Sequence, residues 1–364
     1  MLAIVLLAVS QQPALAGAGT PAGFAPQPAT AEELRALFPD AWKLPRVDRK
    51  RANLPCRRFE QQLQRLAREP LASGAHGTPL MLGDLLARAT AAARLPSLDA
   101  ARKEIAALLA DARARVPAAL WPQVEPLLDV REFLSPKWDP DDDEERSGFL
   151  TGESWELPAD CWPAGDGKRN VEQCAVFMAA DVATIKLCEA DFPSYFAYPD
   201  NNYLHVAAVP HSYHAELLAE REPVAGLACA ARTTLTMDFE SDLPFPFGTY
   251  ACRLRMLTEL DAEGRTITWV YSDSPDFYWL AGYDLYEPVH DSAGAFVGML
   301  VIRQFGCDLD GVPDGGGDHR GGMRTVLGGV KRQAEALWRE RAAAGPFPLT
   351  GAVPVFAVVP GKSR

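Results

Sequence analysis

The sequence lacks the short motifs by which several large classes of enzyme are recognised. It contains no GxSxG, no GxxxxGKS/T loop and no GxGxxG after a predicted strand. These absences exclude the usual signatures of α/β-hydrolases, P-loop nucleotide hydrolases and dinucleotide-binding enzymes. The sequence also lacks any run of 18 consecutive apolar residues, so no internal transmembrane helix is predicted.

Cysteine pairs at metal-binding or redox spacing are also absent. None of the seven cysteines belongs to a CxxC pair, which excludes a zinc ribbon and a thioredoxin-type motif. Cys161 and Cys174 flank a loop rich in Pro and Gly, and they are the best candidates for a disulfide if the chain is exported. Cys229, Cys252 and Cys307 lie in predicted strands, where we expect them to be small buried hydrophobes.

Two patterns resemble metal sites without completing them. The densest histidine cluster consists of His205, His211 and His214. Its members converge only if Pro210 makes a turn, and otherwise we interpret them as partly exposed. An EF-hand loop that began at Asp308 would need oxygen ligands where Val312 and His319 stand. We therefore predict no metal and no cofactor.

The first residues resemble an export signal. Leu2 to Val9 is an apolar run too short to span a bilayer, and Ala14-Leu15-Ala16 fits the small-x-small pattern before a cleavage site. The pattern predicts a signal peptide over residues 1–16 with cleavage after Ala16, a flexible leader over 17–30, and a periplasmic or secreted protein. No Lys or Arg precedes the apolar run, so a plain Ala-rich leader stays the alternative.

Charge is unevenly distributed along the chain. Residues 1–138 hold 18 Lys and Arg and 13 Asp and Glu, which gives +5, and residues 139–364 hold 18 and 35, which gives −17. The acidic second half argues against nucleic acid as a partner. The densest basic cluster consists of Arg46, Arg49, Lys50, Arg51, Arg57 and Arg58. Such a cluster is either a solvated surface or a peripheral contact with anionic lipid headgroups.

The first part of the chain has the composition and periodicity of helices. Residues 31–135 form a predicted helical region, in which Leu98–Arg115 places Ile105, Leu108 and Leu109 on one face. Residues 136–169 contain an acidic run and a Pro/Gly-rich stretch, which predicts a solvated linker. The helical region is either a small separate domain or an arm packed on the second half of the chain.

Strands dominate from residue 170 onward. Alternating or continuous apolar patterns predict strands at Cys174–Ala179, Tyr203–Val209, Ala228–Phe239, Tyr250–Glu259, Arg265–Tyr271, Trp279–Glu287 and Phe296–Phe305. A short helix is predicted after Asp181, and an amphipathic helix runs from about Val326 to Trp338. Gly345 and Pro346 end that helix, and residues 343–364 form a Pro-rich tail.

A series of antiparallel hairpins closed by a long C-terminal helix is the layout of the helix-grip fold. Three stretches carry the resemblance, namely Leu243–Phe247, Tyr283–Pro288 and Phe305–Pro313. Over residues 170–342 the chain resembles the START-like (SRPBCC) superfamily. Two departures stand out: Gly248-Thr249 replace an expected Arg-Asp, and Asp314–Gly322 lengthens the hinge before the final helix.

The resemblance implies a curved antiparallel sheet that holds a long C-terminal helix. Together with the small all-helical N-terminal region, which lies outside the resemblance, this predicts an α+β fold. It also implies an apolar cavity that binds or carries a lipid or another hydrophobic small molecule. Candidate cavity-lining residues are Met256, Trp269, Tyr271, Tyr283, Met299, Val301, Val326 and Val330. Each of these side chains has an ordinary core position as its alternative.

Gly328 and Gly329 lie inside the final helix as predicted, where each costs about 1 kcal/mol relative to Ala. A close backbone approach or an open pocket would explain that cost. The alternative is a helix that begins only after Gly329.

Two other functions are alternatives to the binding of a hydrophobic molecule. A cyclase- or hydrolase-like enzyme on the same fold requires ionisable side chains, such as Asp284 or His205, to converge in the cavity. A structural or interaction module requires a filled core. Nothing in the sequence establishes catalysis. Analogy with the fold favours the binding of a hydrophobic ligand first, the interaction module second and the enzyme third.

Overall fold

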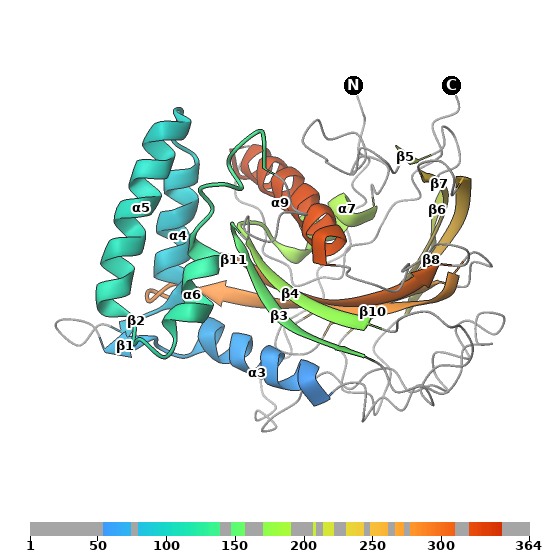
Figure 1. Ribbon diagram of the computed structural model, residues 1–364, viewed down its shortest axis with the longest axis horizontal. Helices are drawn as coiled ribbons and strands as arrows, with labels where there is room; N and C mark the ends of the chain where they lie inside the picture. The colour runs from blue at the N-terminus through green and yellow to red at the C-terminus, as the bar shows by residue number, and fades with distance from the viewer. Residues whose placement is uncertain are drawn as a thin grey trace.

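The computed structural model describes residues 54–73, 79–138, 147–156, 170–190, 207–208, 214–221, 231–243, 248–260, 266–272, 277–309 and 320–343. One large antiparallel sheet carries helices on both of its faces, and more helices gather at one end (Figure 1). The chain is therefore a mixed α+β protein, as expected. No helix within these ranges is both long and apolar enough to cross a membrane. The predicted signal peptide, the leader and the Pro-rich tail after residue 343 lie outside the described residues.

The helical region forms three packed helices at one end of the sheet and a fourth along it. α4 (Leu82–Ala93), α5 (Leu98–Arg115) and α6 (Trp121–Leu128) pack together, and α3 (Leu54–Arg68) precedes a two-stranded ribbon of β1 (Ala72–Ser73) and β2 (Pro79–Leu80). The predicted apolar face of α5 is confirmed, since Ile105, Leu108 and Leu109 are all buried.

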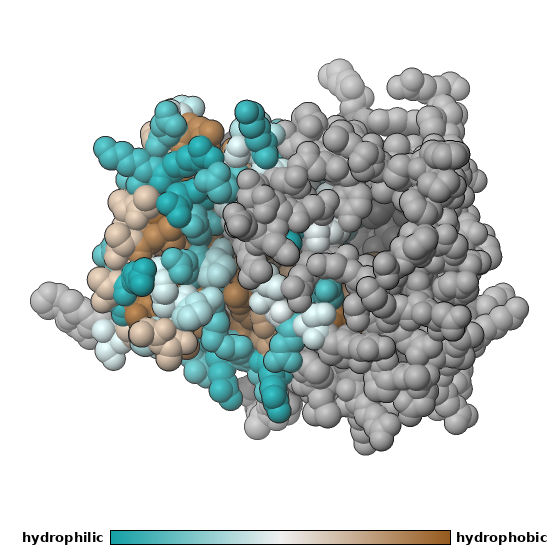
Figure 2. Space-filling model, in the orientation of Figure 1, coloured by the Kyte–Doolittle hydropathy of each residue, from teal (hydrophilic) through white to brown (hydrophobic). Residues whose placement is uncertain are grey.

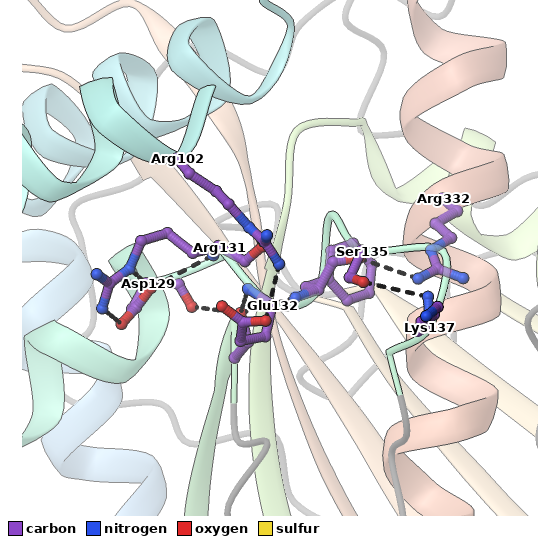
Figure 3. A network of polar contacts seen from close by, with 9 residues as sticks. Arg102, Asp129, Arg131, Glu132, Ser135, Lys137 and Arg332 are labelled. Carbon is purple, nitrogen blue, oxygen red and sulfur yellow. Dashed lines mark hydrogen bonds and ion pairs between the residues drawn. The ribbon is translucent and has the colours of Figure 1, made fainter. Parts of the chain in front are cut away.

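The helical region is an arm joined to the sheet rather than a separate unit. Residues 129–138 run between α5 and the long C-terminal helix α9 (Arg320–Ala343) (Figure 3). Arg102 of α5 donates to the carboxylate of Glu132 at 2.8 Å, and Arg332 of α9 donates to the carbonyl oxygen of Phe133 at 3.0 Å. Ser147 also accepts hydrogen bonds from the backbone of Glu132 and Phe133. One short segment thus links the arm, the sheet and the final helix.

Nine strands form the large sheet among the described residues. They are β3 (Phe149–Glu156), β4 (Asn170–Met178), β5 (Ala207–Ala208), β6 (His214–Arg221), β7 (Ala231–Leu243), β8 (Gly248–Leu260), β9 (Thr266–Ser272), β10 (Phe277–His290) and β11 (Phe296–Leu309). Their order is β3-β4-β11-β10-β9-β8-β7-β5, with β6 also paired to β7, and every pairing is antiparallel. The sheet bends, so that β7 and β8 rise at the end opposite α4 and α5 (Figure 1).

The predicted strands from β7 to β11 are confirmed to within a few residues. The expected turn at Asp291–Gly294 is present, where the Gly294 amide donates to the Asp291 carbonyl at 2.9 Å and Gly294 has a φ of 80°. The linker predicted over 136–169 is partly wrong, because β3 lies inside it and pairs with β4. The only apolar pair in this edge strand is Phe149-Leu150 at its start. Two residues are too few to show the alternating pattern by which a strand is predicted from sequence.

The period of two along each strand divides the sheet into two faces. We call the face that α9 covers the inner face, and the face on which α3 lies the outer face. Helix α7 (Val182–Ala190) packs beside α9. Figure 1 shows α9 and α7 on one side of the strands and α3 on the other.

Helix α9 is held on the sheet by polar contacts of Lys331 and Glu335 with the backbone that ends β4, and by an aromatic contact. Lys331 Nζ donates to the carbonyl oxygen of Phe177 and to the carboxylate of Glu335, each at 2.6 Å, and Glu335 accepts the amide of Ala179 at 3.0 Å. On the next turn, a Cβ atom at Gly328 would lie only 2.9 Å from the ring of Trp138.

The position of Trp138 explains the glycine inside α9. The helix includes Gly328 and Gly329, so the alternative of a helix that begins after them is wrong. Trp138 is buried, stacks on Phe149 at a centroid distance of 5.7 Å and meets Phe133 edge-on at 5.1 Å. The close approach of this ring to the helix backbone favours a residue without a side chain at position 328.

We predict that Gly328→Val lowers the free energy of unfolding by about 2 kcal/mol, because its side chain overlaps Trp138 in a filled core. Urea denaturation measures this loss. In a Trp138→Leu background the same substitution should cost clearly less. An equal cost in both backgrounds would show that Trp138 is not the reason for the glycine.

Candidate functional site

The predicted cavity-lining residues are divided between the two faces of the sheet. Met299 and Val301 lie on the inner face, and Val330 is buried on α9. Val326 of α9 is only partly buried. Val301 and Val330 are completely enclosed by protein atoms, and their contact with a ligand stays a prediction.

The position expected for Tyr283 is wrong. Its hydroxyl donates to the carboxylate of Glu60 on α3, which places Tyr283 on the outer face, away from α9. A period of two explains the error, because Asp284 and Tyr286 point to the opposite face. Met256, Trp269 and Tyr271 belong to β8 and β9, whose backbone pairing is described, but their side chains lie outside the described residues.

A buried polar cluster occupies the inner face where β10 and β11 pass beneath α7. Lys186 Nζ donates to Glu189 Oε2 at 2.5 Å and to the hydroxyl of Tyr286 at 2.8 Å. The Tyr286 hydroxyl donates in turn to Glu189 Oε1 at 2.7 Å. The lysine and the glutamate are one turn apart on α7, and the tyrosine comes from β10.

Arg303 and Asp284 complete the cluster from the middle of the sheet. The two residues are register partners on β11 and β10. Arg303 donates through Nε and Nη2 to the two oxygens of Asp284, both at 2.7 Å. Arg303 Nη2 also lies 3.6 Å from Glu189 Oε1. We call Lys186, Glu189, Asp284, Tyr286 and Arg303 the inner cluster; with two cations and two carboxylates, its formal charge is zero.

The inner cluster holds its proton donors in the protonated state. Burial raises the pKa of Tyr286 well above its usual value, and the carboxylates of Glu189 and Asp284 raise it further. Burial alone would lower the pKa of Arg303, but the charge and hydrogen bonds of Asp284 outweigh it, so that the pKa of this guanidinium is raised. The cluster therefore presents a neutral phenol and a permanent cation at neutral pH.

Cys174 lies beside the cluster as the register partner of Arg303 on β4. Its thiol is free and buried, so the structure contradicts the expected disulfide with Cys161; Cys161 itself lies outside the described residues. Burial raises the pKa of the Cys174 thiol to about 12, although the nearby Arg303 opposes this change. A thiol in that state is neither a nucleophile nor a metal ligand at neutral pH.

Burial of four charged groups costs free energy that burial of apolar side chains does not, because each charge must leave water. Even a well-paired buried ion pair often contributes no net stability, because desolvation of the two ions offsets their attraction. A cluster of this kind is therefore more informative about function than a buried leucine would be. Its placement on the face that α9 covers makes it the strongest candidate site among the described residues.

Sequence reasoning found only one member of this cluster. Asp284 was named as a possible acid or base, and it does converge with other ionisable groups, whereas His205 lies outside the described residues. Lys186 and Glu189 were missed, although a Lys and a Glu one turn apart in an otherwise apolar helix were a usable signal. Tyr286 and Arg303 gave no signal beyond their strand positions.

The structure offers no metal centre within the part that it describes. No group of three or more His, Cys, Asp or Glu side chains there is arranged to hold a metal ion. His211 and the segment from Asp310 to His319, which carried the two metal patterns, lie outside the described residues.

We predict that Arg303→Met lowers the free energy of unfolding by about 3 to 5 kcal/mol, because it leaves the Asp284 carboxylate buried without its partner. The double variant Asp284→Leu/Arg303→Met should recover most of that loss, since it removes both charges. Chemical denaturation of the two variants measures the difference. A double variant no more stable than the single one would contradict the description of these residues as a coupled pair.

A second prediction concerns pH. The thiol of Cys174 keeps its proton up to about pH 12 in the folded chain, whereas an unfolded cysteine loses its proton near pH 8.5. The folded state thus binds more protons between these values, and stability falls as pH rises through them. Between pH 7 and pH 10, wild-type protein should lose about 2 kcal/mol more than Cys174→Ala. Equal losses in urea titrations would contradict the burial of this thiol.

Comparison with known proteins finds no matching family model and no matching curated protein. Among solved structures, a STAR-related lipid transfer protein fragment from Xanthomonas axonopodis matches with a TM-score of 0.31 and 13% identity, over 53% of this chain and 99% of that one. The di-domain ARO/CYC protein StfQ, from the steffimycin biosynthetic pathway, matches with a TM-score of 0.27 and 16% identity, over 48% of this chain and 52% of that one. Both likenesses are remote, so functional inference rests on the residues of the chain itself.

Proposed function

We propose that this chain is an exported START-like protein of the helix-grip fold, which holds a hydrophobic small molecule on the inner face of its sheet. The order of elements supports the fold. β4 and α7 are followed by antiparallel strands β5 to β11 and then by α9, and β11 pairs back with β4. This is the layout that the resemblance implies, with β3 added at one edge and the helical arm in front.

The observation that carries the proposal is the exposure of Arg303. Its side chain is 13% exposed, although it lies at the middle of the sheet beneath a helix. The other charged members of the inner cluster, Lys186, Glu189 and Asp284, are only 2%, 5% and 3% exposed. Among the contacts that the structure describes, Nη1 of Arg303 has no hydrogen-bond partner. Arg303 therefore has the most exposed side chain of the inner cluster, and it also carries the donor that is left without a partner there.

An open donor next to a closed cluster specifies the ligand chemistry. Nη1 offers two N–H groups, and a carbonyl or hydroxyl oxygen accepts them. The inner cluster already has a net charge of zero, so a carboxylate or phosphate would bring an unbalanced charge into a buried site. We therefore infer that the ligand is apolar and carries an uncharged acceptor oxygen, which Arg303 orients.

The filled part of the core limits where such a ligand lies. Phe133, Trp138 and Phe149 fill the space between α9 and the strands β3 and β4. Beyond Arg303 in the strand order lie β9, β8 and β7. We place the apolar body of the ligand over these strands, and Met256 on β8 remains a proposed contact.

An enzyme on the same fold is the second candidate, because its required convergence of ionisable groups is present in the inner cluster. The protonation states argue against catalysis by this cluster. Tyr286 and Cys174 keep their protons at neutral pH, and both carboxylates are paired with cations. General base catalysis needs a group free to take a proton. The geometry therefore favours ligand binding over reaction.

The test is native mass spectrometry of detergent-free protein, followed by solvent extraction. Wild-type protein should carry uncharged apolar molecules that contain oxygen, or bind the neutral dye Nile red after extraction. The variant Asp284→Leu/Arg303→Met should lose most of this binding. The control Arg102→Met also replaces an ion-paired arginine, but on α5 and outside the inner cluster, and it should keep the binding. Wild-type protein that holds no ligand and does not bind the dye would refute the proposed function.

A further inference from the structure

Helix α3 is amphipathic, with one side buried in the protein and the other side in contact with solvent. Phe59, Leu63 and Leu66 are buried against the rest of the fold. Arg58 and Arg65 are exposed on the opposite side. Figure 1 shows α3 on the outer face of the sheet, at the lower edge of the view. Figure 2, in the same orientation, shows hydrophilic side chains along this lower edge. One side of the helix is therefore core and the other is a solvent surface.

The outward side of α3 carries positive charge only. The single acidic residue of the helix, Glu60, accepts the hydroxyl of Tyr283 and is thereby turned toward the sheet. Arg68 is paired with the buried Glu287 and still leaves its side chain 42% exposed. The helix thus keeps its carboxylate inside and presents its arginines outside.

In the sequence, basic residues are concentrated within this helix and in the residues just before it. Residues 46–68 contain eight Lys and Arg and two Asp and Glu, which gives +6. The whole chain has a net charge of −12, so the remaining residues sum to −18. A basic segment on a strongly acidic protein creates an electric dipole, which orients the molecule in front of a negatively charged surface.

We propose that the outward side of α3 is a docking surface for an anionic lipid bilayer. A bilayer presents a broad plane, which a single straight helix on the outside of the fold can meet along its length. Its negative headgroups attract the exposed arginines.

Nucleic acid fits this surface less well. Single-stranded nucleic acid is bound by aromatic side chains on which bases stack. The one aromatic residue within residues 46–68 is Phe59, and it is buried. A flexible polyanion would also reach the acidic parts of the chain, where it is repelled. The observations therefore favour a lipid surface.

The test is co-sedimentation of the full chain with vesicles of phosphatidylcholine alone or mixed with phosphatidylglycerol, at low and high salt. Wild-type protein should bind the anionic vesicles and leave them at high salt. Arg58→Glu/Arg65→Glu should weaken binding at least about 25-fold, because each arginine contributes about fivefold near an anionic surface. The control Arg94→Glu/Lys103→Glu makes the same charge change at the C-terminal end of α4 and on α5, and should stay within about twofold of wild type.

The outcomes separate this proposal from the proposed function. Equal loss in both double variants would show a response to net charge alone and overturn the docking surface. Equal binding to neutral vesicles, or tighter binding to duplex DNA than to anionic vesicles, would overturn it as well. The ligand content of Arg58→Glu/Arg65→Glu, measured by native mass spectrometry, should equal that of wild type, because these residues lie on the other side of the sheet from the inner cluster.

Discussion

Paired charge at the centre of the sheet is the constraint around which the rest of the structure is arranged. Arg303 needs a carboxylate partner there, because an arginine side chain keeps its positive charge even when it is buried. Asp284 supplies that partner from the adjacent strand with two hydrogen bonds of 2.7 Å. This pairing requires the register in which residues 284 and 303 face each other, and a slip by one residue would leave both charges buried alone.

The same requirement extends to helix α7. Glu189 lies 3.6 Å from Arg303 and needs cations and donors of its own, which Lys186 and Tyr286 provide. The helix is therefore positioned by polar contacts to the inner face as well as by its packing against α9. Removal of the helix would leave Tyr286 without Lys186 and Glu189, and Arg303 without Glu189. The helix and the sheet therefore depend on each other at this point.

Periodicity in the sequence predicted the elements well because it reflects contacts within an element. α5 and the strands from β7 to β11 appear close to their predicted ranges, and α9 includes its predicted core. Contacts between distant segments are not encoded in any local period. The pairing of Lys186 with Tyr286, 100 residues apart, and the packing of Trp138 against Gly328 belong to this class. Tyr283 shows a further limit, since the correct strand was assigned to the wrong face.

The sheet separates the two surfaces for which roles are proposed. Arg303 points to the inner face beneath α7, whereas α3 lies against the outer face through Glu60 and Tyr283. A ligand on the inner face therefore cannot pass directly from a bilayer that contacts α3, because the hydrogen-bonded strands β10 and β11 stand between them. Docking through α3 would hold the protein at a membrane and fix its orientation. Exchange of the ligand would then take place at the opposite side, where the helices cover the sheet, and the two activities would respond to different substitutions.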